Sequence, residues 1–337
     1  MYSIKKIPVG DQVLTMITVN TPQLDISFID YGAAIYDLQV PDKDGHKETV
    51  VLQYQNMQQY LENKRHLNAS IGPTAGRIQN GVYTIDDTTI QLDQNFLKKH
   101  TLHGGVDALS YTFFDFELLE EEERVQVTFK TVKKQYFQQY PGNQEYEIVY
   151  TIEGLNITIE FIAKTDTPTV INLTNHAYFN LSGNLRSTIM NHEMQIHAST
   201  KLALDDEMIP YAVESITDTI YDYTDMQPIQ KPGFPGIDDP YMLDHVGLDT
   251  IAATVQDPVS KRRLDVYTTY PCVVCYTDNF PQDDALAFDR DNVLHMGVCF
   301  ETQNPPNGIY VEGVESSILR PHERYYHKTI FAFSVEE

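Results

Sequence analysis

The side chains that could carry chemistry centre on a run of alternating residues between positions 169 and 181. Successive side chains of a strand point to opposite faces of its sheet. One face of this expected strand is mostly apolar, interrupted by Asn175, and predicts core. The other face carries His176 and Tyr178 beside a hydroxyl and two amides. Such a face suits a pocket for a hydroxyl-rich molecule, although a core histidine bonded to its asparagine neighbours would give the same pattern.

A second candidate group is Glu301, which lies in an expected strand over residues 298–302. Glu301 and Gln303 share one face of that strand, and the apolar Val298 and Phe300 face the other way. Burial would raise the pKa of the carboxyl and make it a usable general base. The alternative is a carboxylate that pairs with Arg77 for structure alone.

Three further polar residues lie in segments rich in turns. Arg77 follows two glycines that leave space for a backbone or a ligand, and a buried ion pair is its alternative role. His103 precedes paired glycines in a loop, which by itself is a weak signal. Asp238 and Asp239 place two carboxylates in one turn, within a long loop-rich region over residues 205–239 that is typical of functional loops.

The three cysteines argue for structural roles. An odd, low number of cysteines argues against a disulfide framework. Cys272 and Cys275 have the spacing of a metal or redox motif, but the stretch over residues 265–277 reads as strand. Residues three apart on a strand face opposite ways, so these two thiols could not share a ligand. With no second pair of Cys or His residues to complete a zinc site, the sequence predicts no metal.

The elements around these residues predict an all-β fold. Strands are expected over residues 113–119, 125–131, 146–152 and 156–163, and further short strands follow to the end of the chain. Residues 56–63 are one of very few candidates for a helix. We therefore expect a large antiparallel β-sandwich with very few short helices, and one domain over residues 1–337.

Composition narrows the classes of partner. The chain has 337 residues, 42% of them hydrophobic, and a formal charge of −24. A strongly acidic surface repels phosphate backbones and anionic membranes, so neither nucleic acid nor membrane partners are expected. The sequence shows no signal peptide and no apolar run long enough to span a membrane, which makes the cytoplasm the expected compartment. There is no Trp, so Tyr, Phe and His would have to stack on any sugar ring.

Several segments together resemble the aldose 1-epimerases, or galactose mutarotases, over nearly the whole chain. Each segment alone is weak, but seven in the right order are specific. The resembling segments are residues 31–33 with 40–45, 75–78, 102–105, 172–181, 236–238, 301–306 and 319–325.

The resemblance implies a galactose mutarotase-like supersandwich that interconverts the α and β anomers of a free monosaccharide without cofactor or metal. It also implies that Glu301 is the general base at the C1 hydroxyl and His176 the general acid at the ring oxygen. Arg77, His103 and Asp238 would bind sugar hydroxyls. Tyr178, on the face of His176, would contact the sugar ring or support the site from behind, and the oligomeric state stays open.

The chain also departs from the family pattern. Gly76 stands where relatives commonly have Asn, and Pro73 where many have Arg. Asp239 replaces a frequent His, and His322 replaces a Gly near the C-terminus. None of these changes removes the expected acid or base, but they bear on sugar specificity and on catalytic strength.

Two other functions fit the same residues. One is a sugar-binding or sensor protein without catalysis, which the altered residues favour. The other is a glycoside hydrolase that uses Asp238 and Glu301 as its carboxylate pair, which needs the carboxyl groups about 5–5.5 or 6.5–9.5 Å apart. The survival of both proton-transfer groups favours the epimerase over the binding protein.

Overall fold

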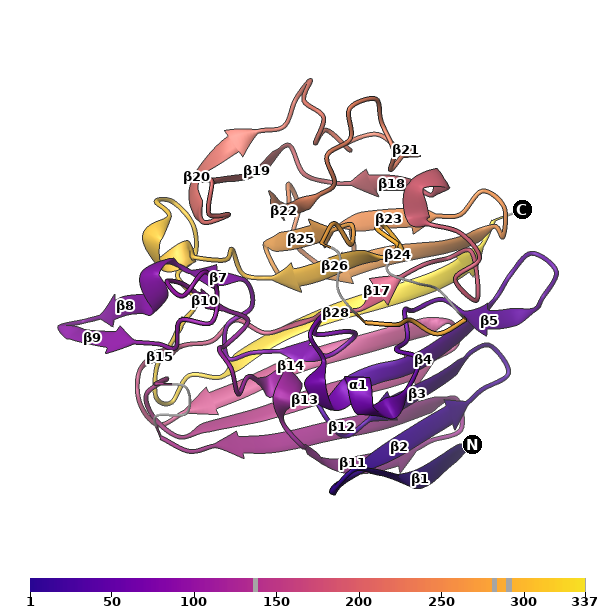
Figure 1. Ribbon diagram of the computed structural model, residues 1–337, viewed down its shortest axis with the longest axis horizontal. Coiled ribbons are helices and arrows are strands. Elements are labelled where there is room, and N and C mark those ends of the chain that lie inside the picture. Colours follow the sequence, from indigo (N-terminus) through magenta and orange to yellow (C-terminus); the bar gives the residue numbers. More distant parts are fainter. Residues whose placement is uncertain (136–138, 281–283, 289–292, 337) are drawn as a thin grey trace.

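A sheet of nine antiparallel strands runs through the molecule (Figure 1). The computed structural model describes residues 1–135, 139–280, 284–288 and 293–336. The nine strands, from one edge to the other, are β11 (Asp115–Glu120), β12 (Arg124–Lys133), β13 (Gln144–Glu153), β14 (Asn156–Thr165), β28 (Tyr325–Val335), β24 (Arg262–Thr268), β23 (Ala253–Gln256), β18 (Glu193–Ile196) and β21 (Gln227–Pro228). The four strands predicted between residues 113 and 163 are confirmed as β11–β14, joined as successive antiparallel neighbours.

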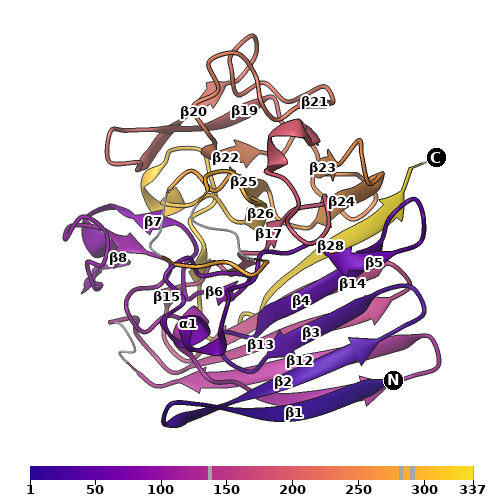
Figure 2. The ribbon, with the colours of Figure 1, turned by 45° about the vertical axis from the view of Figure 1, so that its right-hand side comes forward.

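Two shorter antiparallel sheets lie against this long sheet. The first is built from the N-terminal strands β1 (Tyr2–Val9), β2 (Gln12–Asn20), β3 (Asp25–Ile29), β4 (Ala34–Pro41) and β5 (Lys47–Thr49). The second has the order β17 (Tyr178–Phe179), β26 (Val298–Gln303), β25 (Cys272–Tyr276), β22 (Asp238–Met242), β19 (Thr200–Leu204) and β20 (Pro210–Ser215). Figure 2 shows the indigo N-terminal strands lying over β12–β14, as expected for a sandwich.

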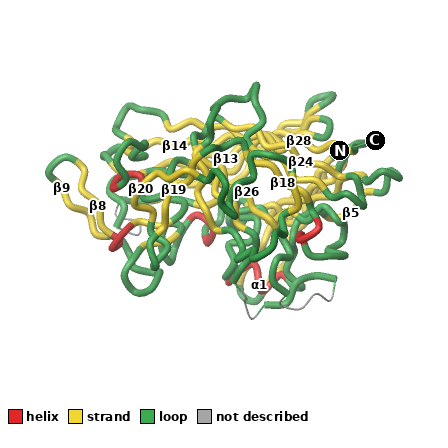
Figure 3. The backbone as a smooth tube through the Cα atoms, turned by 90° about the horizontal axis from the view of Figure 1, so that it is seen from above, coloured by secondary structure: helices red, strands yellow, loops and turns green. Residues whose placement is uncertain are grey.

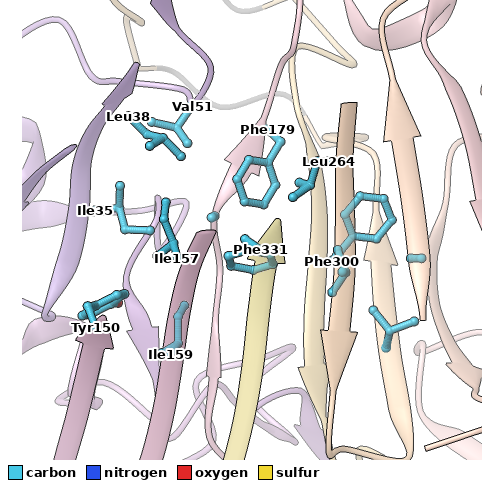
Figure 4. Packing of buried hydrophobic residues seen from close by; sticks show 14 of the residues in the cluster. Ile35, Leu38, Val51, Tyr150, Ile157, Ile159, Phe179, Leu264, Phe300 and Phe331 are labelled. Carbon is cyan, nitrogen blue, oxygen red and sulfur yellow. The ribbon is translucent and has the colours of Figure 1, made fainter. Parts of the chain in front are cut away.

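The sandwich closes on one continuous hydrophobic core that all three sheets share. Figure 4 shows Ile35 of β4 near Ile157 of β14, and Phe300 of β26 farther along the same core. Between them, the ring of Phe179 packs edge-on against Phe331 with centroids 5.0 Å apart. Burying each such side chain contributes about 1.5–3 kcal/mol to the free energy of folding. Together these contributions determine which face of each strand points toward the core. Glu301, one residue from Phe300, therefore points outward.

Short elements complete the fold. Figure 3 shows strands and loops with few helices among the described residues. The helix α1 (Met57–Glu62) begins at Asn56, whose side chain accepts hydrogen bonds from two backbone N–H groups and so confirms the predicted helix. No helix among the described residues is long and apolar enough to cross a membrane. The two-stranded pairs are β6 (Ser70–Ile71) with β16 (Thr174–Asn175), β7 (Arg77–Ile78) with β10 (Thr101–Leu102), β8 (Val82–Ile85) with β9 (Thr88–Gln91), and β15 (Thr169–Val170) with β27 (Ile318–Leu319).

The prediction of one continuous strand over residues 169–181 was wrong. The segment forms the short strands β15, β16 and β17, and each pairs with a different partner. Between them, the backbone N–H groups donate to loop groups, as Asn172 does to the carbonyl of Pro73 and His176 to that of Ala69. Because loops satisfy these groups one by one, an extended chain can thread through the interior without a long strand partner. Both of its faces are buried.

The stretch over residues 265–277 is likewise two strands in different sheets, β24 and β25. Cys272 and Cys275 both lie in β25, buried and free, three residues apart and so on opposite faces. The predicted reason for rejecting them as a ligand pair is confirmed. The Sγ atom of Cys275 contacts the sulfur of Met194 at 3.7 Å, in the core.

Arg262 ties the N-terminal sheet to the long sheet at the start of β24. Its guanidinium is fully buried and donates to the backbone carbonyls of Val40, His46 and Leu181. It also lies 3.1 Å from a carboxylate oxygen of Glu48. A single side chain thus satisfies buried acceptors from three separate segments.

We expect Arg262→Met to lower the free energy of unfolding by about 3–5 kcal/mol, because it removes three buried hydrogen bonds to backbone carbonyls, each worth about 1–1.5 kcal/mol, while Glu48 keeps its pair with Arg186. Arg263→Met is the matched control. Arg263, the next residue, is 24% exposed and pairs with Asp265 and Glu336, so its loss should cost about 0–1 kcal/mol. Denaturant unfolding measures both. Equal losses for the two variants would contradict the role given to Arg262.

Candidate active site

A cavity of about 160 Å³ opens on the outward face of the six-stranded sheet. Strand register places Glu301 of β26 opposite Val274 of β25, which lies opposite Pro240 of β22. These side chains form the cavity floor, because the alternate residues of the same strands face the core. All six residues predicted from the sequence line this one cavity: Arg77, His103, His176, Tyr178, Asp238 and Glu301.

Glu301 and His176 face each other across the floor. Oε1 of Glu301 lies 3.4 Å from Nε2 of His176, and the two side chains are 4% and 6% exposed. Burial raises the pKa of the Glu301 carboxyl well above its ordinary value; the Asp238 carboxylate raises it further, and Arg77 opposes the rise. Burial lowers the pKa of the His176 imidazole to about 3, helped by His66. Both groups are therefore biased toward their neutral forms.

The orientation of the His176 ring is fixed from two sides. Its Nδ1 lies 3.5 Å from Sγ of Cys299, and its face stacks on Tyr178 with centroids 4.9 Å apart and planes at 22°. Burial raises the pKa of the Cys299 thiol, so the sulfur stays neutral and can accept a weak hydrogen bond from the Nδ1–H of the ring. Nε2 then carries the lone pair that faces Glu301 and can accept the proton of its neutral carboxyl. Tyr178 donates its hydroxyl to the carbonyl of Arg65 at 3.0 Å, which leaves its ring as the part that can support the site.

His103 enters the cavity from the loop after β10. Its Nδ1 accepts a hydrogen bond from the backbone N–H of Gly76 at 3.3 Å, so the neutral ring carries its proton on Nε2. Burial, then the neighbouring His66, His176 and Arg77, hold the pKa of His103 well below its ordinary value. The next residue must be glycine, because a Cβ on Gly104 would lie 2.2 Å from the carbonyl oxygen of Gly72. His103 thus presents a fixed N–H donor.

Arg77 and Asp238 form an ion pair on the cavity wall. Nη2 of Arg77 lies 3.3 Å from Oδ2 of Asp238, and the two side chains are 14% and 15% exposed. The guanidinium also packs over the ring of Phe96 at 4.7 Å. Arg77 therefore pairs with Asp238, and the alternative in which it pairs with Glu301 was wrong.

His103, His176 and Glu301 bring ligand atoms within 4.8 Å of one another, which is the spacing of a possible metal site. The tautomer of His103 opposes that use. A metal at its Nε2 would move the ring proton to Nδ1, where it would meet the N–H of Gly76 donor to donor. The arrangement fits a sugar hydroxyl, which can accept the Nε2 proton, better than a cation.

Sequence reasoning missed the residues that close the cavity opposite its floor. His66 holds Nδ1 at 2.9 Å from the hydroxyl of Ser110 and packs edge-on against His103, 5.0 Å between centroids. Arg65, beside it, is buried between Asp278 and Asp284, each 2.8 Å from a guanidinium nitrogen. They follow α1 in a loop with no periodic pattern. Only the run of three basic residues over 64–66 could have drawn notice.

Comparisons with known proteins agree over the whole chain. Residues 15–332 match the family model for aldose 1-epimerase. A galactose mutarotase of Mus musculus is 33% identical over 340 residues, covering 98% of this chain and 97% of the relative. An aldose 1-epimerase of Escherichia coli strain K12 is 28% identical over 345 residues, with the same coverage of both chains.

Solved structures share the fold. A galactose 1-epimerase from Lactobacillus acidophilus superposes with a TM-score of 0.87 at 22% identity, covering 100% of this chain and 99% of that one. A GalM/aldose epimerase homologue from C. elegans gives the same TM-score and identity, with 100% of both chains covered. The expected mutarotase-like sandwich is thereby confirmed. From the match along its length and the degree of identity, the chain belongs to the aldose 1-epimerase family, whose members are isomerases.

Proposed function

We propose that this protein interconverts the α and β anomers of a free hexose such as galactose or glucose. The observation that carries the proposal is the buried pair of Glu301 and His176, which face each other at 3.4 Å in a cavity lined by hydroxyl-binding groups. One face of a sugar ring can rest on the aromatic side chains of Tyr276 and Phe280, which also line the cavity and stand in for the missing Trp.

The reaction needs one proton removed and one delivered. Glu301 takes the proton of the C1 hydroxyl, the C1–O1 bond becomes a carbonyl, and the bond from C1 to the ring oxygen breaks. His176 gives its proton to that ring oxygen. The open aldehyde turns about its C1–C2 bond, and closure from the other face returns both protons with the roles reversed. Each well-placed group of this kind contributes about 10²–10⁴-fold.

The pair works with one proton shared between its members. Because the pKa of Glu301 is raised and that of His176 lowered, the free protein holds this proton on Glu301. Moving it to His176 gives the reactive arrangement. Both arrangements contain the same number of protons, so their ratio does not change with pH.

The remaining predicted residues surround the reacting atoms. His103 offers its Nε2 proton, and Arg77 with Asp238 offers donors and an acceptor to sugar hydroxyls. A binding or sensor protein would need these groups but would not need two buried proton-transfer groups facing each other. No observation in the described residues favours that alternative.

We expect Glu301→Gln to reduce the catalysed rate about 10²–10⁴-fold, because the amide cannot accept the hydroxyl proton. Polarimetry of fresh α-galactose or α-glucose measures the rate over buffer. Glu117→Gln is the control, since Glu117 is exposed on β11 and away from the cavity. An unchanged rate for Glu301→Gln would refute the base, and release of nitrophenol from a nitrophenyl galactoside by the wild type would favour a hydrolase.

We expect the pH profile of kcat/KM to be flat through mildly acidic pH. A second proton reaches the pair only near the lowered pKa of His176, about 3, and the shared proton is lost only above the raised pKa of Glu301. Activity should therefore fall on the alkaline side as the last proton leaves. An acid limb near pH 6.5, where a solvated imidazole titrates, would contradict this account.

A further inference from the structure

Gln303 is a buried amide in the cavity wall with no hydrogen bond. It lies two residues beyond Glu301 on the same face of β26 and is 0% exposed. Neither its Oε1 nor its Nε2 has a partner. Among the described residues, no other side chain has two buried polar atoms in this condition. Leaving such groups unmet costs about 1–3 kcal/mol each, so the amide is expensive unless something binds it.

The surroundings of Gln303 offer its amide no hydrogen-bond partner. Gly76 packs beside it: a Cβ there would lie 3.5 Å from Nε2 of Gln303 and 2.5 Å from Cβ of Pro306. The backbone of the neighbouring Asn304 is bonded to Asn172, because its N–H donates to the side-chain oxygen of Asn172 and its carbonyl accepts from the side-chain amide of Asn172. Turning the amide of Gln303 toward the cavity breaks no hydrogen bond, since it makes none.

Three side chains on one face of β26 form a line that passes along the cavity, and Glu301 and Gln303 line it. Cys299 marks the end beside His176, at 3.5 Å, Glu301 lies in the middle, and Gln303 marks the other end. Neighbours in this line are about 6.6 Å apart along the strand, since each residue rises about 3.3 Å. The order across the site is therefore His176, Glu301, Gln303.

This order corresponds to the order of atoms around C1 of the sugar. The ring oxygen and C2 lie on opposite sides of C1, and the C1 hydroxyl lies between them. If His176 meets the ring oxygen and Glu301 meets O1, as the proposed function holds, the next group along the line meets the substituent on C2. Resting on that function, we propose that Gln303 binds the 2-hydroxyl of the substrate and positions it for reaction.

An amide suits this position for two reasons. Its oxygen accepts the proton of the 2-hydroxyl while its NH₂ group donates to a neighbouring sugar oxygen, and it stays neutral whichever member of the acid–base pair holds the proton. It also holds C2 while the aldehyde turns about the C1–C2 bond. Gln303 is thus a positioning residue, which fixes the half of the sugar that does not rotate.

The test compares Gln303→Met with the wild type on galactose, 2-deoxygalactose and 6-deoxygalactose. Met keeps the unbranched shape and removes both polar atoms. We expect kcat/KM to fall about tenfold to a hundredfold on galactose and on 6-deoxygalactose. On 2-deoxygalactose the kcat/KM values of the two proteins should be nearly equal, because this sugar has no 2-hydroxyl for Gln303 to bind. For each sugar, the kcat/KM of the variant is divided by that of the wild type, which cancels the sugar's own intrinsic rate of mutarotation.

Gln144→Met is the matched control. Gln144 is equally buried but bonded through both amide atoms, to the carbonyl of Pro141 and the hydroxyl of Tyr146. Its loss should lower the Tm and leave the pattern across the three sugars unchanged. Gln303→Met should not lower the Tm of the free protein, because no bond is lost there. A lower Tm with equal losses on all three sugars would make Gln303 structural and overturn the proposal, as would no loss on any sugar.

Calorimetric affinities of the same proteins for the same sugars separate this inference from the proposed function. A wild type that binds galactose without accelerating its mutarotation would refute the function. The Gln303 assignment would still stand if Gln303→Met weakened binding of galactose but not of 2-deoxygalactose. The assignment would be refuted if the variant weakened the binding of both sugars equally.

Discussion

The structure depends on holding a carboxyl group and an imidazole in contact away from water. Desolvation disfavours the charged form of each, and it moves the pKa of Glu301 up and that of His176 down. A polar pair in such a place destabilises the fold unless the rest of the protein supports it. The support comes from a rigid floor beneath Glu301 and from the stack of Tyr178 and the thiol of Cys299 against His176.

The sandwich makes that floor rigid because one face of the six-stranded sheet is fully used by the core. Phe300 and Val298 of β26 point inward, and strict alternation then directs Glu301 and Gln303 to the cavity, with Cys299 on the same face behind His176. The walls come from loops far away in sequence. Arg77 lies on β7, and His103 directly follows β10, the strand that pairs with β7. A slip of one residue in β26 would exchange the base for a core phenylalanine.

Much of this could be predicted from sequence. The apolar alternation of β26 and β11–β14 identified their inward faces, and the outward position of Glu301 followed from it. The break-up of the segment over residues 169–181 could not be predicted, because its backbone partners are loops such as that of Pro73, brought close only by the fold. His66 and Arg65 were missed for the same reason, since neither lies in a periodic element. Asn175, which interrupts the apolar face of that segment, donates its amide to the carbonyl of Asn68.

Two of the departures from the family pattern, Gly76 and Asp239, have local physical explanations that leave the acid–base pair untouched. Gly76 has a φ of +71° and no room for a Cβ against Pro306, so the backbone there excludes any longer side chain. Asp239 is buried and pairs with Lys201 at 2.9 Å, next to but separate from the pair of Asp238 and Arg77. Asp239 thus lines a neighbouring groove with Lys201 and is not among the residues that line the cavity of Glu301 and His176. Selectivity among sugars can therefore change in this chain while Glu301 and His176 keep the same geometry.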